Sequence, residues 1–191
     1  MEPTEEVPRD HPAKSRRRGF IEWVIVLVAA VLLSFLVRTF VVQEYFVPSG
    51  SMRPTLYIGD RILVNKLSVD FGTINIGDIV VFKAPPDVKK LCHDDVTDLV
   101  KRVIGVPGDS LYSKGNTIYV DGKALKQNWS VFKTMGTTPI TPITLKSSQY
   151  FMMGDNHADS CDSRTWGPVP RSDIIGKVFL KVWPLSHWHW F

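Results

Sequence analysis

The feature that most constrains this chain is an apolar run over residues 20–37, FIEWVIVLVAAVLLSFLV. The run carries a single charge, Glu22, close to its start, where a carboxylate can reach the edge of a bilayer. A helix of this length, rising about 1.5 Å per residue, can cross the hydrocarbon core. We therefore predict one membrane-spanning helix over residues 19–38.

Basic residues flank this run unevenly. Lys14, Arg16, Arg17 and Arg18 precede it, whereas only Arg38 follows it closely. By the positive-inside rule, residues 1–18 form a cytoplasmic tail and residues 39–191 lie on the other side of the membrane. A cleaved signal sequence and a buried core helix are the alternatives. The apolar run continues well past its pair of alanines, and no small-x-small site follows its end, which favours a retained anchor.

Length and composition limit the rest of the chain. A length of 191 residues, 44% hydrophobic and 22% charged, suits one globular domain with a short appendage. The formal charge of +4 is scattered along the chain and no nucleic-acid motif accompanies it, so we predict no nucleic-acid partner. Cys92 and Cys161 are too few for a disulfide scaffold and lack CxxC spacing. A single bridge between them and two unpaired thiols both remain open.

The residues after Thr39 have the texture of a β domain. β-Branched and aromatic residues gather in short runs that Gly, Asp, Asn and Pro separate. The Asp121-Gly122 pair between two such runs predicts a hairpin. Residues 126–148 are rich in Lys, Thr, Ser and Pro and predict an exposed excursion. Further predicted turns lie at the Gly-Asp pairs of 59–60, 77–78, 108–109 and 154–155, and a last strand over 176–183 ends at Pro184.

Ser51 and Lys101 are the candidate chemical groups. A serine hydroxyl is a weak nucleophile until a base removes its proton, and Lys101 lies in the apolar run 99–104, where desolvation lowers a lysine pKa. Ser51 lies in a turn-like stretch between Pro48 and Pro54, next to a glycine that lets the backbone approach a substrate. The Ser49 hydroxyl and the Ser51 amide are candidate donors to an oxyanion.

Five segments in order resemble the sequence boxes of the type I signal peptidases, the membrane-anchored Ser/Lys proteases that remove signal peptides from exported proteins. They are PSGSMRPTL at 48–56, GDRILVNK at 59–66, GDIVVFKAP at 77–85, KRVIGVPGD at 101–109 and GDNHADSCDSR at 154–164. The resemblance covers residues 43–184, and the single preceding anchor is typical of the smaller bacterial members.

The resemblance implies a mainly β fold of packed antiparallel sheets and a role for each matched residue. Ser51 is then the nucleophile and Lys101 the general base, with Ser49 and the Ser51 amide as the oxyanion hole. Ser160 orients the Lys101 amine, Asp162 and Arg164 form a supporting ion pair, and Met52 and Pro54 hold the nucleophile turn. The implied substrates are secretory preproteins with small residues at the first and third positions before the cut. The implied partner is membrane lipid, the implied place the cytoplasmic membrane of a bacterium, and no cofactor or metal is implied.

One segment departs from the family pattern. His157-Ala158-Asp159 stands where the family usually has Arg-Asp-Asn, and we expect this to affect loop packing more than activity. A Ser-His-Asp site built on His157, or on His93 with Asp94 and Asp95, rests on residue type alone. Cys92, His93, His157 and Cys161 match no common metal-ligand spacing.

Three rival functions remain open. A pilin-processing peptidase of conjugative transfer shares the Ser/Lys chemistry, and a repressor-type self-cleaving protease normally lacks an anchor and carries a DNA-binding module. A tethered β domain that binds precursors without cutting them is the alternative outside enzymes. The aromatic tail after Pro184 either packs in the core or places Trp188, Trp190 and Phe191 in the membrane interface.

Overall fold

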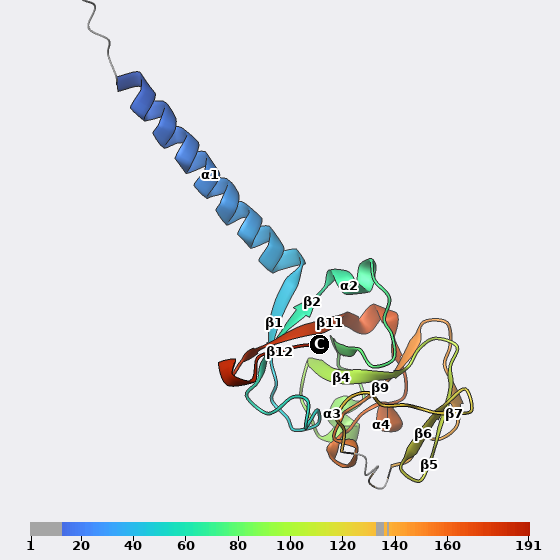
Figure 1. Cartoon of the computed structure of the whole chain (residues 1–191). Coiled ribbons are helices and arrows are strands. Elements are labelled where there is room, and N and C mark those ends of the chain that lie inside the picture. Colours follow the sequence, from blue (N-terminus) through green and yellow to red (C-terminus); the bar gives the residue numbers. More distant parts are fainter. Residues whose placement is uncertain (1–12, 133–135, 137) are drawn as a thin grey trace, which may run out of the picture. The chain divides into compact units, whose positions relative to one another are not determined.

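The computed structural model describes residues 13–132, 136 and 138–191, which form two compact units divided between Thr39 and Phe40. The first unit contains one long helix, α1 (Ala13–Phe40) (Figure 1). Its segment Arg18–Phe35 has the length and hydropathy of a membrane span, and none of that segment is buried within the protein. The prediction of a long apolar helix near the N-terminus is confirmed.

The second unit is built on an eight-stranded sheet in which every pairing is antiparallel. The strand order is β1-β2-β11-β3-β4-β9-β10, and β12 pairs with β11. The bounds are β1 (Val42–Phe46), β2 (Arg61–Asn65), β3 (Ile79–Lys83), β4 (Asp98–Gly105), β9 (Gln149–Met153), β10 (Val169–Pro170), β11 (Ile174–Trp183) and β12 (His189–Trp190). The prediction of a mainly β domain of antiparallel sheets is confirmed.

A smaller sheet has the strand order β7-β6-β5-β8 (Figure 1). Its strands are β5 (Ser110–Lys114), β6 (Thr117–Val120), β7 (Lys123–Ala124) and β8 (Ile143–Thr144). Asp121 and Gly122 join β6 to β7 with φ angles of 50° and 74°, as a tight hairpin turn requires. The predicted hairpin is therefore confirmed.

The main sheet carries a hydrophobic core on both faces, because successive strand residues point to opposite sides. On β3, Ile79 and Val81 pack in one cluster with Met52 and Leu56, while Val80 and Phe82 pack in another. A third cluster joins the two sheets: Ile104, Leu111, Ile118, Ile140, Leu145, Phe151 and Met153. The segment that carries Ser51 is thus anchored in the first cluster.

The connections differ in part from the sequence predictions. They contain the short helices α2 (Leu67–Asp70), α3 (Val88–Cys92) and α4 (Ser163–Trp166), and the 3-10 turns η1 (His157–Asp159), η2 (Arg171–Asp173) and η3 (Leu185–His187). Helices of one turn leave no period for sequence analysis to detect. The segment 126–148 is not wholly exposed, since it buries Ile140 and Leu145 and contributes β8; its residues 133–135 and 137 lie outside the described part.

Candidate active site

The segment between β1 and β2 holds Ser51 in a closed loop. Val47 donates its amide to the carbonyl of Asp60 at 2.9 Å and accepts the Gly59 amide at 3.0 Å, so the base of the loop is pinned. Met52 is fully buried and accepts the Leu56 amide at 2.9 Å. These contacts hold Ser51 in place, with 9% of its surface exposed.

Lys101 approaches Ser51 from strand β4. Its backbone pairs with Val80 of β3, and the residue is 3% exposed. The Lys101 Nζ donates a hydrogen bond to Ser51 Oγ over 2.5 Å, although fifty positions separate the two residues. The structure therefore brings together the two groups that the sequence singles out as nucleophile and base.

Burial changes the proton affinity of this lysine. Desolvation lowers the pKa of Lys101 to about 8, although the carboxylates of Asp162 and Asp94 oppose that change. The Arg164 guanidinium lowers the same pKa further, by like-charge repulsion. A lysine with a pKa near 8 has a usable neutral fraction at neutral pH, as a general base requires.

Two further hydroxyls lie beside the pair. Ser49 Oγ is 3.3 Å from Ser51 Oγ, and the Ser51 amide donates to no group among the described residues, so it is available to an oxyanion. Ser160 Oγ is buried and has no hydrogen-bond partner in the described part of the chain. The bond from Ser160 to the Lys101 amine that the resemblance implies is therefore not formed in this structure.

An ion pair supports the loop that carries Ser160. Arg164 Nε and Nη2 each donate to the Asp162 carboxylate over 2.8 Å, and both side chains are almost fully buried. The same guanidinium donates to the carbonyls of His157 at 2.7 Å and Ser160 at 3.2 Å. His157 thus contributes its backbone to this support, and the loop packs around Arg164 without the family's usual Arg-Asp-Asn.

A second buried ion pair was missed by the sequence analysis. Arg102 Nε and Nη2 donate to the Asp155 carboxylate, each over 2.7 Å, with the two side chains 6% and 1% exposed. Asp155 also accepts a short hydrogen bond from the Thr55 hydroxyl, four positions after the nucleophile. Both charged residues lie inside quoted motifs, but each motif taken alone gives no indication that the two side chains pair.

The GDN segment also contacts the nucleophile turn directly. Asn156 donates its amide to the Ser51 carbonyl at 3.0 Å and its side chain to the Gly50 carbonyl at 3.3 Å. Any β-carbon at Gly154 would collide with the Ser51 carbonyl and with Ser160. Only glycine at this position, directly after β9, permits so close an approach to Ser51.

A disulfide forms one wall of the candidate catalytic cleft. Cys92 at the end of α3 is bonded to Cys161, which resolves the alternative that the sequence left open. Both cysteines line a cleft of about 520 Å³ together with Ser51, Lys101 and Ser160. With both sulfurs in the bridge, the cysteines are not free to ligate a metal. No hydrogen bond joins His93 or His157 to Ser51 among the described residues.

Comparison with known proteins assigns the sequence to one family. The family model described as signal peptidase, peptidase S26, matches residues 20–183. The chain belongs to this family. Its match includes the apolar helix and all eight predicted site residues, and it ends before the C-terminal aromatic tail.

Several bacterial proteins are similar to this signal peptidase. A probable signal peptidase I-2 of Synechocystis is 35% identical and aligns over 95% of this chain and 83% of its own length. A signal peptidase I of Leptolyngbya laminosa is 32% identical over 96% and 91%, and signal peptidase I P of Bacillus subtilis subsp. natto is 36% identical over 91% and 94%. A crystal structure of a signal peptidase I from Enterococcus faecalis covers 55% of this chain and 96% of its own, with 23% identity and a TM-score of 0.42. The chain is accordingly a signal peptidase, a hydrolase of peptide bonds.

Proposed function

We propose that this signal peptidase is a membrane-anchored Ser/Lys endopeptidase that cleaves signal peptides from translocated preproteins. The observation that carries the proposal is the 2.5 Å contact between Lys101 Nζ and Ser51 Oγ in a buried site. The lowered pKa of Lys101 supports the same assignment, because it leaves part of the amine neutral near pH 7, and only the neutral amine can accept a proton from Ser51.

The chemistry proceeds in two halves. Neutral Lys101 accepts the Ser51 proton while Oγ attacks the scissile carbonyl, and the Ser51 amide and Ser49 hydroxyl donate to the oxyanion. The ammonium then returns its proton to the departing amine, which leaves an ester on Ser51. Water that transfers its proton to the same amine hydrolyses this ester and restores the free hydroxyl.

The substrate is proposed to bind as an extended strand. Residues 45–49, at the end of β1, and 98–101, at the start of β4, offer backbone groups to such a strand, while side-chain pockets select the residues. A pocket beside Ser51 has a volume of only about 40 Å³ and is lined by Tyr45, Ile62, Val81 and Leu99. A shallow apolar pocket of this kind supports the preference for small residues before the cut.

Anchoring is proposed to follow the charge pattern of the N-terminal helix. Residues 19–38, which contain nearly all of the candidate span Arg18–Phe35, would cross the cytoplasmic membrane of a bacterium, with residues 1–18 inside and residues 39–191 outside. Membrane lipid and the preproteins are then the partners of the enzyme, and residues 19–38 are its anchor.

The direct test compares purified full-length wild type, Ser51→Ala and Lys101→Ala on a labelled secretory preprotein. Lys83→Ala is the matched control, because Lys83 is an exposed strand lysine. Loss of cleavage in the first two variants, with intact folding by circular dichroism, is expected. Near-normal cleavage by Lys101→Ala would remove the base assignment. Cleavage of a pilin precursor but not of the secretory one would favour the pilin peptidase, and binding without turnover by wild type would favour a non-catalytic relative.

A further inference from the structure

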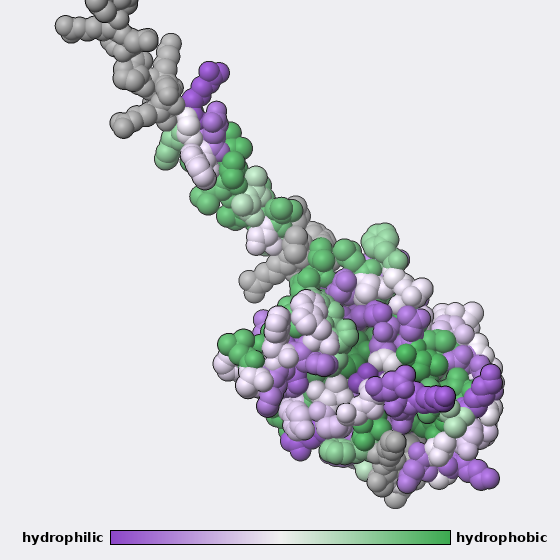
Figure 2. Space-filling view, viewed as in Figure 1, coloured by the Kyte–Doolittle hydropathy of each residue, from purple (hydrophilic) through white to green (hydrophobic). Residues whose placement is uncertain are grey.

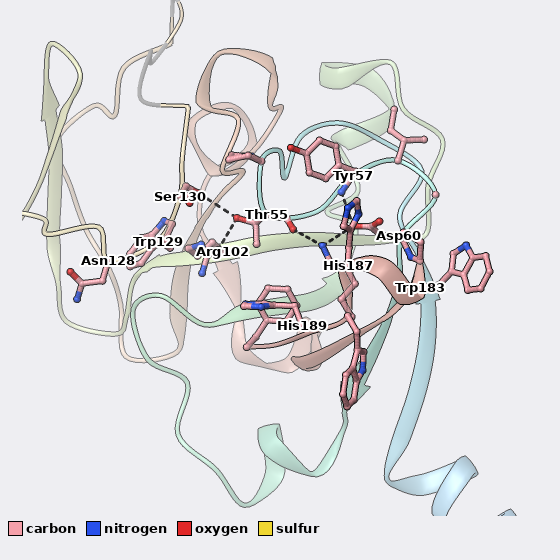
Figure 3. A pocket seen from close by; sticks show the side chains of 17 residues that line it. Thr55, Tyr57, Asp60, Arg102, Asn128, Trp129, Ser130, Trp183, His187 and His189 are labelled. Carbon is pink, nitrogen blue, oxygen red and sulfur yellow. Dashed lines mark hydrogen bonds and ion pairs between the residues drawn. The ribbon is translucent and has the colours of Figure 1, made fainter.

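The domain contains a second cavity that the peptidase chemistry does not use. Its volume is about 1010 Å³, roughly twice that of the catalytic cleft, and the two share no lining residue among those described. Its walls come mainly from three segments: residues 54–60, which follow Ser51, residues 128–130, and the C-terminal residues 181–191 (Figure 3). The family match ends at residue 183, so the tail that lines this cavity lies beyond it.

Lys181 of β11 lines this cavity, and its ammonium can form hydrogen bonds beyond those it makes within the protein. Its side chain is 9% exposed, and its Nζ donates a hydrogen bond to the Thr55 carbonyl over 3.4 Å and forms an ion pair with the Asp60 carboxylate over 3.4 Å. Both distances are long for charge-assisted hydrogen bonds, and an ammonium has three donors. Asp60 already accepts the Tyr57 amide at 2.9 Å. Lys181 can therefore serve a stronger external acceptor.

Two histidines add donors around the same point. His189 on β12 stands directly opposite Lys181 in the antiparallel register, and cross-strand partners project from the same face. His187 lines the cavity as well, and both imidazoles are exposed. The other cation in the lining, Arg102, is committed to Asp155 and to the Gly77 carbonyl. Lys181, His187 and His189 are thus the groups available to an anion.

The rim of the cavity is amphipathic and aromatic. Tyr57, Ile58, Trp183 and Trp188 line the cavity and are 45%, 55%, 52% and 56% exposed, and Leu185 beside them is 75% exposed. Figure 2 shows hydrophobic residues at the edge of the domain where the dark red C-terminal segment of Figure 1 lies. Exposed tryptophan and tyrosine are the side chains that favour the headgroup level of a bilayer. The tail is therefore not part of the hydrophobic core.

We propose that this cavity binds the phosphate headgroup of one anionic phospholipid. Lys181, His187 and His189 hold the phosphate, while Trp183, Trp188 and their apolar neighbours lie among the headgroups. A lipid is the expected source of the phosphate because the rim is apolar and the domain follows a helix able to span a membrane. The inference rests on the proposed membrane anchoring but not on the Ser/Lys chemistry.

The test uses the full-length protein in dodecyl maltoside micelles, with binding measured by native mass spectrometry and by tryptophan fluorescence. The probes are dihexanoyl-phosphatidylglycerol, dihexanoyl-phosphatidylcholine and inorganic phosphate. We expect one phosphatidylglycerol to bind about tenfold or more tightly than phosphatidylcholine, because the two share the phosphate but the choline ammonium would be repelled by the Lys181 ammonium. Lys181→Gln and the pair His187→Gln with His189→Gln should each remove most of that preference, whereas Lys83→Gln should preserve it.

Each contrary result overturns a specific part of the inference. Equal affinity for the two lipids contradicts the selectivity for an anionic headgroup that the proposal requires, and inorganic phosphate that binds as tightly as phosphatidylglycerol removes the lipid. A preference that survives in the histidine pair and in Lys181→Gln places the lipid elsewhere. The histidine pair keeps the test valid if Lys181→Gln misfolds, because both imidazoles are exposed. Cleavage of a preprotein is measured separately, so a failed lipid site and a failed peptidase give different results.

Discussion

The pH dependence of cleavage tests the role of Lys101 most directly. Only the neutral amine can accept the Ser51 proton, and the pKa of Lys101 is about 8. The neutral fraction is then about one half at a pH near 8, roughly one tenth at pH 7 and roughly one hundredth at pH 6. Because kcat/KM reports the free enzyme, it should fall close to tenfold per pH unit below the midpoint. A fluorogenic preprotein peptide assayed between about pH 5.5 and 9.5 measures this limb.

A single carboxylate provides the companion variant. Asp94 lines the catalytic cleft and raises the pKa of Lys101, so Asp94→Asn should move the acid limb of the profile to lower pH. Asp95→Asn is the matched control, since Asp95 pairs with exposed Lys89 instead and should leave the midpoint in place. A flat profile from acid to alkaline pH, or a midpoint that rises in Asp94→Asn, would refute a lysine base of this kind.

Three other predictions concern the support of the site. Arg102→Met leaves the Asp155 carboxylate buried without its partner and should lower the free energy of unfolding by about 3–5 kcal/mol in urea titrations. The double variant with Asp155→Leu should recover part of this loss. An equal loss in the single and double variants would contradict the idea that the unpaired charge causes it. Gly154→Ala should reduce kcat far more than it raises KM, because its β-carbon displaces the Ser51 carbonyl; unchanged kinetics would show that the turn accommodates it. Cys92→Ser with Cys161→Ser should cost about 2–4 kcal/mol of stability and lower kcat by loosening the Ser160 loop, and an unchanged unfolding midpoint would argue against a structural role for the bridge.

The sequence predicts the strands and the central pair well, for identifiable reasons. Short β-branched runs between Gly-Asp pairs leave few alternatives to strands such as β2 and β3, and the order of the motifs places Lys101 with Ser51. The apolar run likewise predicts one long helix, because a run of this length has few other uses, although α1 begins at Ala13 and ends at Phe40, beyond the predicted residues 19–38.

What the sequence could not predict depends on tertiary distance. The bond between Cys92 and Cys161 spans 69 positions and needs α3 to lie against the Ser160 loop, which no local pattern encodes. Ile140 and Leu145 lie in a polar, proline-rich segment, and their burial follows from a second sheet rather than from their neighbours. The pair of Arg102 with Asp155 joins two motifs across the sheet, so neither motif alone reveals it.

Side chains along β4 alternate between the two faces of the sheet, which makes the enzyme sensitive to the register of this strand. Adjacent residues place a titratable cation, Lys101, toward the nucleophile and a permanent cation, Arg102, toward the opposite face. A slip of one residue against Val80 would exchange the two, and a guanidinium that never loses its proton cannot act as a base. Deleting one residue within β4 ahead of Lys101, such as Val100, would then leave every quoted motif intact in the sequence while placing the Arg102 guanidinium at the position of the base.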